Sequence, residues 1–494
     1  MSYLDLLQLA APETIVVIAA LAVLFADFTM REVELSMRLV IGGMIACVGC
    51  VVAIGWIFLV PAHQGAPGGM FAVDGLTQFV KIGLLAMTIF TLLLSMQSNF
   101  TPHAGEYFAL ILLATVGMMF LVSSEDLLMI FVSLELTSLS LYILAAFGKE
   151  SRKSAEAALK YFLFGGMSAA FTLFGLSLVY GFSGATNLRE IAAALAGKGL
   201  DPLLVVAIVM VVIGFGFKVA AAPFHLWAPD VYEGAPTPSA ALIASGSKVA
   251  SFVILAKVMI LGFAGLEGSA AWRHEITGWL PLIAVVAGFS MLVGNFAALV
   301  QTSVRRLLAY SAIAHAGYVL LGVMAHSGAG LSSLVYYTIT YGLTAIGAFG
   351  VVMVVEQSAG GEKLSDFAGL GRRAPLVSFC MLIFMLSLAG IPPLAGFFGK
   401  FYVFAAALQT GAPNLGLLWL VILAIAMSAV SLYYYLQVLK QIYVTEVPGN
   451  TSKLKISLLS QVVLGLLAAS VVVFGCAPSL ILNGLEQAIR LAGF

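Results

Sequence analysis

The chain has 494 residues, of which 62% are hydrophobic and only 9% are charged. Because roughly a quarter of the residues in soluble domains are charged, this composition excludes an ordinary soluble protein and indicates many transmembrane helices. The 23 basic and 23 acidic residues give a formal net charge of zero. With this balance, and with no basic or acidic tail, nucleic acid is not expected as a partner.

The first apolar run is interpreted as a retained helix. Residues 1–11 contain no lysine or arginine, whereas a secretory signal begins with positive charge. The next run contains Cys47 and Cys50 in a C-x-x-C pattern; Cys380 and Cys476 stand alone. A single pair offers too few ligands for an iron–sulfur cluster or a structural zinc. We therefore expect plain buried cysteines and no cofactor or metal in this chain.

Apolar runs of transmembrane length recur along the whole chain. They are separated by short connections rich in glycine, proline, asparagine and serine, and no connection resembles a soluble domain. The sequence therefore predicts one all-α polytopic membrane domain over residues 1–494, with about fourteen transmembrane helices. The predicted spans are 12–28, 38–60, 75–97, 106–122, 126–147, 154–182, 203–223, 237–263, 277–300, 303–325, 331–356, 374–408, 415–440 and 456–478.

The basic residues outside the spans predict the orientation. If the N-terminus faces outward, the odd-numbered loops are cytoplasmic and hold thirteen lysines and arginines, against four on the other side (Arg189, Lys198, Arg273 and Arg490). Positive charge concentrates on the cytoplasmic side of membrane proteins. Both termini are therefore predicted to be periplasmic.

Six lysines fall inside the predicted helices: Lys81, Lys160, Lys218, Lys248, Lys257 and Lys400. Among the acids, Glu135 lies nearest the middle of a span. A charge at the bilayer centre costs about 2.5–3.5 kcal/mol on the insertion scale, so such groups normally pair, line water or relay protons. Lys160 and Lys257 lie near helix ends, where their ammonium groups are expected to reach the headgroups. For Lys81, an ammonium that reaches the headgroups and an ammonium with a role in the protein interior are equally favoured.

The remaining four charges, Glu135, Lys218, Lys248 and Lys400, favour a functional interpretation. Each has at least two turns of apolar helix on one side and a further polar or helix-breaking signal beside it. Ser245 and Ser251 lie three residues on either side of Lys248 and share its helix face. Small polar side chains there leave room for water and can bond to the ammonium.

Two lysines stand beside helix breaks. Lys218 precedes Pro223, whose ring clashes with the carbonyl of Val219 and frees it next to the lysine. Lys400 follows the second break in "LSLAGIPPLAGFFGKF" (386–401). Broken helices at membrane depth are tolerated only where protein covers them or they line a cavity.

The two breaks predict an inverted repeat. They fall on the seventh and twelfth spans, which are five spans apart. Because five is odd, these two spans cross the membrane in opposite directions, so two equivalent units that contain them must be inverted relative to each other. Residues 106–263 (helices 4–8) and 277–440 (helices 9–13) would be the two five-helix units with discontinuous helices 7 and 12. Residues 1–97 would supply helices 1–3, and residues 456–494 helix 14 and a tail.

The stretch "KVAAAPFHLWAPDVYEGAPTPSAALIASGSK" (218–248) resembles the antiporter-like membrane subunits of respiratory complex I. That family includes subunits of multi-subunit sodium/proton antiporters. "AALKYFLFGGMSAAFTLFGLSLVYGFSG" (157–184) and "AGIPPLAGFFGKFYVF" (389–404) narrow the resemblance to the N branch of bacterial proton-pumping NADH:quinone oxidoreductase. The sister M branch typically has glutamate at the position of Lys400, and the L branch adds a long lateral helix. The resemblance covers essentially the whole chain.

The resemblance implies roles for individual residues. Glu135 and Lys218 would form a charge pair, Lys248 would be the central proton-binding lysine, and Lys400 the terminal group towards the outer side. His315 would help to link Lys248 to Lys400, or would be a buried histidine bonded to a backbone carbonyl. His225, Trp227, Asp230 and Glu233, beyond the first break, are structural or entry-path residues, with the structural role favoured.

The resemblance also implies a place for the chain. It would lie in the bacterial inner membrane among neighbouring antiporter-like and small membrane subunits, in contact with lipid, while NADH oxidation and quinone reduction occur elsewhere. Three alternatives stay open: a subunit of a cation/proton antiporter, a mainly structural membrane subunit and, with no quinone motif to support it, quinone chemistry in this chain.

Overall fold

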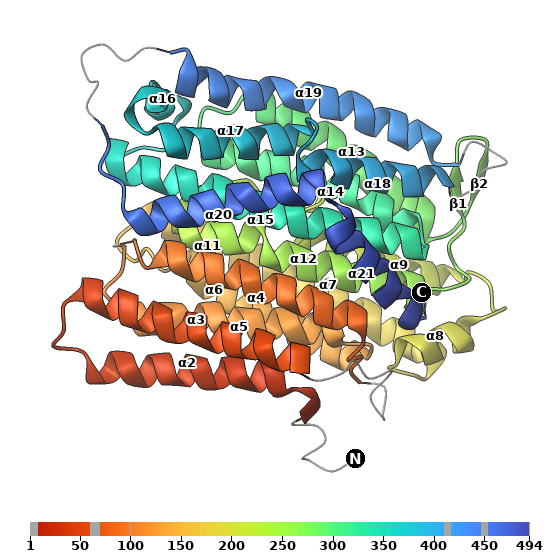
Figure 1. Cartoon of the computed structure of the whole chain (residues 1–494). Helices are drawn as coiled ribbons and strands as arrows, with labels where there is room; N and C mark the ends of the chain where they lie inside the picture. Colours follow the sequence, from red (N-terminus) through yellow and green to blue (C-terminus); the bar gives the residue numbers. More distant parts are fainter. Residues whose placement is uncertain (1–7, 60–69, 99, 410–415, 446–452, 494) are drawn as a thin grey trace.

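Long apolar helices run side by side through the structure, a computed structural model that describes residues 8–59, 70–98, 100–409, 416–445 and 453–493 (Figure 1). Within these residues, twelve helical segments are long and apolar enough to cross a membrane, and two shorter apolar helices, α9 and α17, accompany them. The prediction of an all-α polytopic membrane protein is therefore confirmed. These fourteen are α2 (Ala11–Thr29), α3 (Leu35–Leu59), α4 (Gly75–Ser95), α5 (Ala104–Ser123), α6 (Leu127–Ala145), α7 (Arg152–Ser183), α9 (Pro202–Lys218), α11 (Thr237–Ala244) with α12 (Gly246–Lys257), α13 (Trp279–Leu299), α14 (Val304–Met324), α15 (Gly328–Ala359), α17 (Pro375–Ala389), α19 (Leu418–Tyr443) and α20 (Leu458–Cys476). A further helix, α18 (Ala395–Gln409), follows α17.

Several short elements fill the connections and were not predicted, because hydropathy over a membrane-length window cannot detect them. They are α8 (Leu188–Leu195), α10 (Trp227–Gly234), the π-helix η1 (Val258–Gly262), the 3-10 helix η2 (Leu364–Phe367), α16 (Leu370–Arg373), α21 (Ser479–Leu491) and an antiparallel hairpin of β1 (Ser269–Ala271) and β2 (His274–Ile276). In the hairpin, Ala270 pairs with Glu275.

The two ends of the helix bundle are named here after the predicted orientation. The inner end carries residues 30–34, 146–151 and 360–374, at the left of Figure 1. The outer end carries residues 124–126, 184–187 and 264–278, at the right. At both ends of the bundle, short polar side chains cap the first turns of helices. Asp126 accepts hydrogen bonds from free backbone N–H groups at the start of α6, and Ser151 accepts one at the start of α7.

Two predicted spans that carry prolines are interrupted near those prolines, as the sequence predicted, although the first helix ends earlier than expected. α9 ends at Lys218, five residues before Pro223, so the predicted end at residue 223 is wrong. The reason is that a proline blocks the helix over the preceding turn as well as at its own position. The predicted span 374–408 consists of two helices, α17 and α18, separated at residues 390–394. Gly390 ends α17 with φ +86°, a conformation that glycine adopts without strain.

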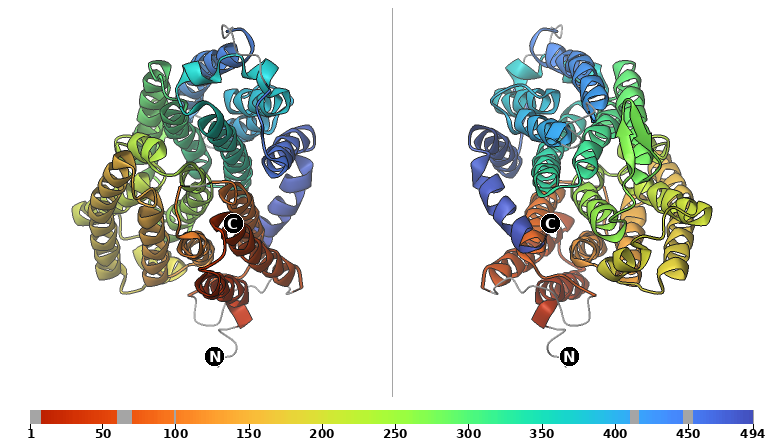
Figure 2. Two further views of the ribbon diagram at one scale, coloured as in Figure 1. Left: turned by 90° about the vertical axis from the view of Figure 1, so that its left-hand side faces the viewer. Right: turned by 90° about the vertical axis from the view of Figure 1, so that its right-hand side faces the viewer.

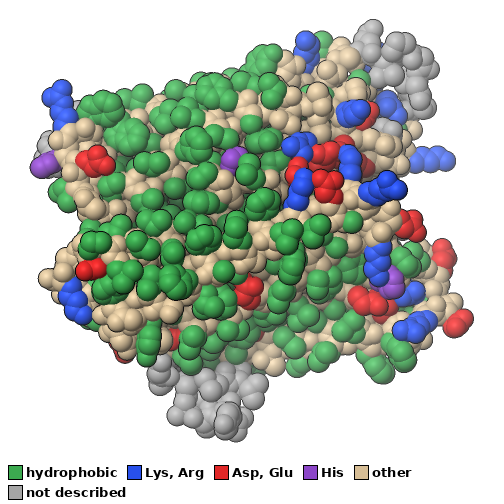
Figure 3. All heavy atoms as spheres, turned by 180° about the vertical axis from the view of Figure 1, so that it is seen from behind, with side chains coloured by type: hydrophobic (Ala, Val, Ile, Leu, Met, Phe, Trp, Pro, Cys, Tyr) green, Lys and Arg blue, Asp and Glu red, His purple; other side chains and the backbone are tan. Residues whose placement is uncertain are grey.

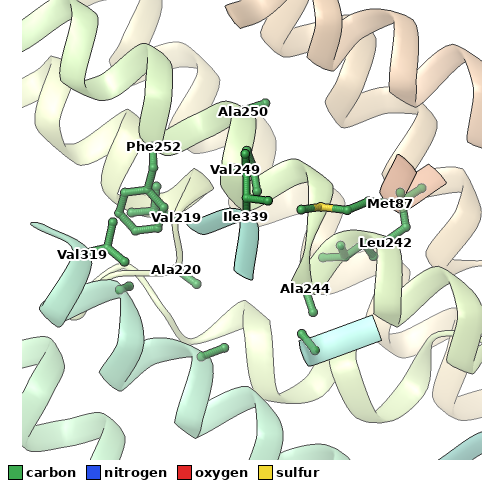
Figure 4. Close-up of a cluster of buried hydrophobic side chains, with 14 of the residues drawn as sticks. Met87, Val219, Ala220, Leu242, Ala244, Val249, Ala250, Phe252, Val319 and Ile339 are labelled. Atoms are coloured by element: carbon green, nitrogen blue, oxygen red, sulfur yellow. The ribbon is translucent and has the colours of Figure 1, made fainter. Parts of the chain in front are cut away.

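A third interruption was not predicted. At Ser245, with φ −116° and ψ −88°, the predicted span 237–263 divides into α11 and α12. Figure 4 shows that this region and the first break meet in a cluster of buried apolar side chains, among them Val219, Ala220, Val249 and Phe252. Protein therefore covers the irregular backbone, as membrane depth requires.

The core of the bundle is formed by α11–α12, α14 and α15. The apolar part of α15 is entirely buried, and this helix packs against α11, α14, α17, α18 and α20 (Figure 2). The outer helices instead expose apolar faces, and these form the hydrophobic surface between the charged ends in Figure 3. The lysines of interest lie on the buried side of this arrangement.

Candidate functional site: a row of buried charges

Glu135 of α6 and Lys218 of α9 lie together at one side of the molecule. Their Oε1 and Nζ atoms are 3.9 Å apart, and Lys218 Nζ donates to Ser138 Oγ at 2.5 Å. The Lys218 side chain is 9% exposed, whereas that of Glu135 is 27% exposed. Ser138, one turn after Glu135, thus holds the ammonium beside the carboxylate without a direct bond between the two charges. This hydroxyl was not identified from the sequence.

Side chains satisfy backbone groups on both sides of Val219 at the first break. The carbonyl of Phe217 accepts from Trp227 Nε1 at 3.0 Å, and Ala222 N donates to Ser290 Oγ at 2.8 Å. The ammonium of Lys218 is directed towards α6, where it binds Ser138, and the release of the Val219 carbonyl stays a prediction. The contact of Trp227 with the backbone favours the structural role for this residue.

Lys248, near the start of α12, is 3% exposed and donates to the backbone carbonyl of Ala312 in α14 at 2.9 Å. Among the described residues, no carboxylate lies within ion-pair distance of it. The hydroxyl groups of the serines predicted to bond to its ammonium have other partners. Ser245 and Ser251 each donate to the carbonyl four residues earlier, which is the nearest acceptor for a serine in a helix.

Lys400 of α18 closes the second break. Its ammonium donates to the carbonyls of Leu388 and Ala389 at 3.0 and 3.1 Å and to Ser428 Oγ at 2.8 Å. The last carbonyls of α17 lack helical partners and carry the negative end of the helix dipole, so a buried cation suits this position. The ammonium also lies 5.1 Å from the centre of the Tyr318 ring.

His315 of α14 is buried among tyrosines. Its Nδ1 lies 2.8 Å from the Tyr337 hydroxyl and its Nε2 lies 3.2 Å from the Tyr435 hydroxyl. Lys248 binds the carbonyl of Ala312, three residues before His315 on the same helix. The Lys400 ammonium lies over the Tyr318 ring, whose centre is 5.6 Å from that of the His315 ring. His315 therefore lies near both lysines.

The tyrosines around His315 were missed in the sequence. Tyr435 is hydrogen-bonded to Ser311, which precedes the Lys248 acceptor by one residue. Asn295 joins two further hydroxyls, since it donates to Tyr318 and accepts from Tyr434. The signal was present: "LVYYTITY" and "SLYYYLQ" place tyrosines inside predicted spans, whereas tyrosine normally concentrates at the membrane surface.

The other three lysines are paired. Lys81 forms a 2.7 Å ion pair with Glu13, which supports its interior role. Lys257 is 0% exposed and donates to the Val122 carbonyl at 2.9 Å, so the expectation that it reaches the headgroups is wrong. Lys160 binds carboxylates of Glu156 and Asp230, both at 2.7 Å, and its side chain is 38% exposed, so its reach to the headgroups stays a prediction.

A network of ion pairs covers the inner end of α11. In order of contact it comprises Glu156, Lys160, Asp230, Arg306, Glu233, Lys153, Glu362, Arg305 and Glu356. Charged side chains also gather at this end in Figure 3. Burial alone would raise the pKa of Asp230 and Glu233, but hydrogen bonds from their cationic partners outweigh it and the pKa of each is lowered. Burial raises the pKa of Glu362. These contacts favour the structural role for Asp230 and Glu233.

A cleft of about 850 Å³ opens beside this network. Lys153, Arg305, Glu356 and Glu362 line it, together with Thr237 at the start of α11. Thr237 donates a short hydrogen bond to Glu356. Water can therefore approach the inner end of α11, the helix directly before α12, and Lys248 follows Thr237 by eleven residues.

The cysteines form no cluster. Cys47, Cys50 and Cys380 are free and buried, and Cys476 is free and exposed. In the part of the chain that the structure describes, no group of three histidine, cysteine or acidic side chains is arranged to hold a metal ion.

Known proteins share both the sequence and this fold. A family model described as NADH:quinone oxidoreductase/Mrp antiporter, TM matches residues 124–428. NADH-quinone oxidoreductase subunit N 2 of Acidobacterium capsulatum is 52% identical, over 98% of this chain and 99% of that protein. A chain of respiratory complex I from Thermus thermophilus with bound aureothin has a TM-score of 0.79 at 32% identity, covering 96% of this chain and 99% of that one.

The fold extends beyond close relatives. A chain of the Mrp complex from Dietzia sp. has a TM-score of 0.82 at 21% identity, covering 99% of this chain and 98% of that one, and shows the shared fold alone. The 52% identity over nearly the whole of both chains identifies the family more closely than the shared fold does, and the row of buried lysines agrees with it. The chain belongs to the antiporter-like membrane subunits of NADH:quinone oxidoreductase, within the subunit N family.

Proposed function

We propose that Glu135, Lys218, Lys248, His315 and Lys400 carry protons through this subunit, coupled to NADH oxidation and quinone reduction elsewhere in the complex. The observation that carries the proposal is that Lys248 and Lys400 are buried among backbone carbonyls and hydroxyls, without a carboxylate to neutralise them among the described residues. Burial favours the neutral amine and carbonyl contacts favour the ammonium, so both protonation states are accessible.

The first step is electrostatic. When Lys218 separates from Glu135, its positive charge is no longer compensated and acts on the neighbouring part of the row. The proton on Lys248 then moves towards Lys400, which has become neutral by releasing its own proton outward. The Lys248 ammonium is bonded to the carbonyl of Ala312, and Ser311 is the residue before it. The Ser311 hydroxyl is therefore the first group on the proposed route from Lys248 to Lys400.

The middle of the route is made of hydroxyls and one imidazole. Ser311, Tyr435, His315 and Tyr337 form a continuous set of hydrogen bonds. Each of these groups can accept one proton and donate another. Together with water they can therefore pass a proton along and return to their original protonation states. Protons are proposed to enter at the 850 Å³ cleft on the inner end.

Glu135 indicates where a neighbouring subunit covers the chain. Leu128, Val132, Leu139 and Ile143 lie on the same face of α6 and are each at least half exposed. A carboxylate in the middle of such a face would be costly against lipid. We therefore place another membrane subunit of the complex on this face, with lipid around the remaining apolar surface. The proposed location is the bacterial inner membrane, with both termini periplasmic and helices 4–8 and 9–13 as inverted repeats.

The test is proton pumping by the complex with Lys400→Ala, measured with and without sodium ions in sealed membrane vesicles. We expect intact assembly on native electrophoresis and fewer protons moved per NADH oxidised, at either sodium concentration. Lys440→Ala, an exposed lysine at the inner end of α19, is the matched control and should behave as the parent. Pumping that depends on sodium would favour cation/proton antiport, and loss of assembly would favour a structural role.

A further inference from the structure

The electrostatic step proposed above needs a second position for the Lys218 ammonium, because it begins when this group separates from Glu135. In the structure the ammonium makes one hydrogen bond, to Ser138, and lies 3.9 Å from Glu135 Oε1. A lysine ammonium has three donors, so two of them have no partner at hydrogen-bond distance among the described residues. The surroundings of Lys218 therefore show where the ammonium can move.

Three side chains of α6 face Lys218 in succession. Glu135, Ser138 and Tyr142 are three and then four residues apart, so they share one face of the helix. The Lys218 ammonium lies 5.9 Å from the centre of the Tyr142 ring and 5.6 Å from that of Phe217. Aromatic faces attract a cation within about 6 Å. The ammonium thus already lies beside the ring that is one turn further from Glu135 than Ser138 is.

The hydroxyl group of Tyr142 is buried without a partner. The residue is 7% exposed, and within the described residues its oxygen takes part in no hydrogen bond of normal geometry. Burying a polar group without a hydrogen bond costs free energy, so such a group in a folded protein requires an explanation. A phenylalanine at this position would pack in the same way without that cost.

Helix α7 holds the ring of Tyr142 and leaves room for its hydroxyl. The ring packs edge to face against Tyr161, with ring centres 4.6 Å apart, and against Phe162 at 6.0 Å. A methyl group added at Gly165, one turn after Tyr161, would overlap the hydroxyl. Packing therefore fixes the position of this hydroxyl, and its hydrogen-bonding capacity stays free for a group that moves towards it.

We propose that the Tyr142 hydroxyl accepts the Lys218 ammonium after it leaves Glu135. The four-carbon stem of lysine is flexible, so the ammonium reaches the hydroxyl by a change of side-chain conformation while the backbone of α9 stays in place. No proton is transferred in this movement. Beside Glu135 the ammonium faces a carboxylate, whereas beside Tyr142 it faces a neutral hydroxyl, so its charge is uncompensated only in the second position. Tyr142 is thus a positioning residue for the electrostatic step, and the inference rests on the function proposed above.

The test is Tyr142→Phe in the complete complex. This variant keeps the ring and its packing and removes the acceptor of the second position. A hydrogen bond to a charged group is strong enough for its loss to shift Lys218 towards Glu135 by roughly ten- to hundred-fold. In sealed vesicles we expect fewer protons pumped per NADH oxidised. Assembly on native electrophoresis and NADH oxidation in uncoupled vesicles should equal those of the parent, and the melting temperature should not fall.

Tyr232→Phe is the matched control. The Tyr232 hydroxyl is also buried without a hydrogen bond within the described residues. Its ring packs against Trp227 and Phe349, and in the described part of the chain no lysine or arginine lies over it. The control therefore removes an equally buried hydroxyl away from Lys218, and it should pump with the parental ratio.

Parental pumping by Tyr142→Phe would overturn the inference, and so would an equal loss of pumping in Tyr232→Phe. Loss of assembly or a lower melting temperature in Tyr142→Phe would also overturn it, because the hydroxyl would then be structural. The outcome is separable from that of the proposed function. If Glu135→Gln lowers the number of protons per NADH while Tyr142→Phe does not, the charge pair is needed and the proposed acceptor is wrong. If neither variant changes the ratio, the electrostatic step itself fails.

Discussion

Replacing Glu135 by glutamine removes the carboxylate that faces the Lys218 ammonium at 3.9 Å. Two unit charges at this distance attract each other by about 4 kcal/mol at an effective dielectric constant of about 20. Since about 1.4 kcal/mol corresponds to a factor of ten in an equilibrium constant, losing this attraction shifts the balance between the paired and separated positions of Lys218 by up to roughly 1,000-fold. Glu135 is partly exposed, so screening reduces the effect.

The shift should appear as a loss of coupling. With Glu135→Gln the ammonium keeps Ser138 as a partner, so the complex should assemble, but the charge no longer alternates between compensated and uncompensated states. We expect fewer protons pumped per NADH oxidised in sealed vesicles, with dye-detected acidification and NADH absorbance recorded together. Glu150→Gln, an exposed acid on the inner loop before α7, controls for the loss of a carboxylate elsewhere.

A variant Glu135→Gln that assembled and pumped with the parental ratio would refute this reasoning. It would show that the charge on Glu135 is not needed for the electrostatic step, whatever the position of Lys218.

Three further outcomes are expected. Gly396→Ala should destabilise the purified complex by about 1–3 kcal/mol, seen as a lower melting temperature, because the added methyl group would overlap a backbone carbonyl of α17; Gly465→Ala, with open space around it, should not. Tyr435→Phe removes the hydroxyl between His315 and Ser311 and should reduce pumping without affecting assembly, whereas the exposed Tyr433→Phe should pump normally. The cationic partners of Asp230 lower its pKa from the usual value of 3.8. Its contribution to stability is therefore fully present above pH 3.8 and is lost as the pH falls through the lowered pKa. In thermal unfolding, Asp230→Asn should lose less of its melting temperature between neutral and acid pH than the parent does.

The sequence predicts the architecture well because hydropathy and punctuation are local signals. The spans around α13, α14 and α19 were placed within a few residues, and both proline-containing breaks were located. The break at Ser245 was missed although Ser245, Gly246 and Ser247 mark it, because kinks are common at such glycine and serine pairs. The signal is not decisive by itself, since α7 continues through Gly165 and Gly166 without a break. The break depends on how α11 and α12 pack against α15 and α5.

The site was only partly predictable. Lys248 and Lys400 could be identified because a charge in an apolar run is conspicuous, but their partners are backbone carbonyls of Ala312 and Leu388, which no side-chain pattern reveals. Lys257 shows the opposite error. Its position near a helix end suggested exposure to headgroups, whereas it is fully buried against the Val122 carbonyl of α5 and Glu125 in the loop that follows. Burial of this kind depends on long-range packing and not on position within a span.

The most direct test of transport through the buried row is Lys248→Ala, with proton pumping and NADH oxidation measured together in sealed membranes and assembly checked by native electrophoresis. If Lys248 holds the proton that moves to Lys400, the complex with Lys248→Ala assembles while pumping and coupled NADH oxidation collapse. If assembly and both activities persist, Lys248 is dispensable and the proposed route is contradicted.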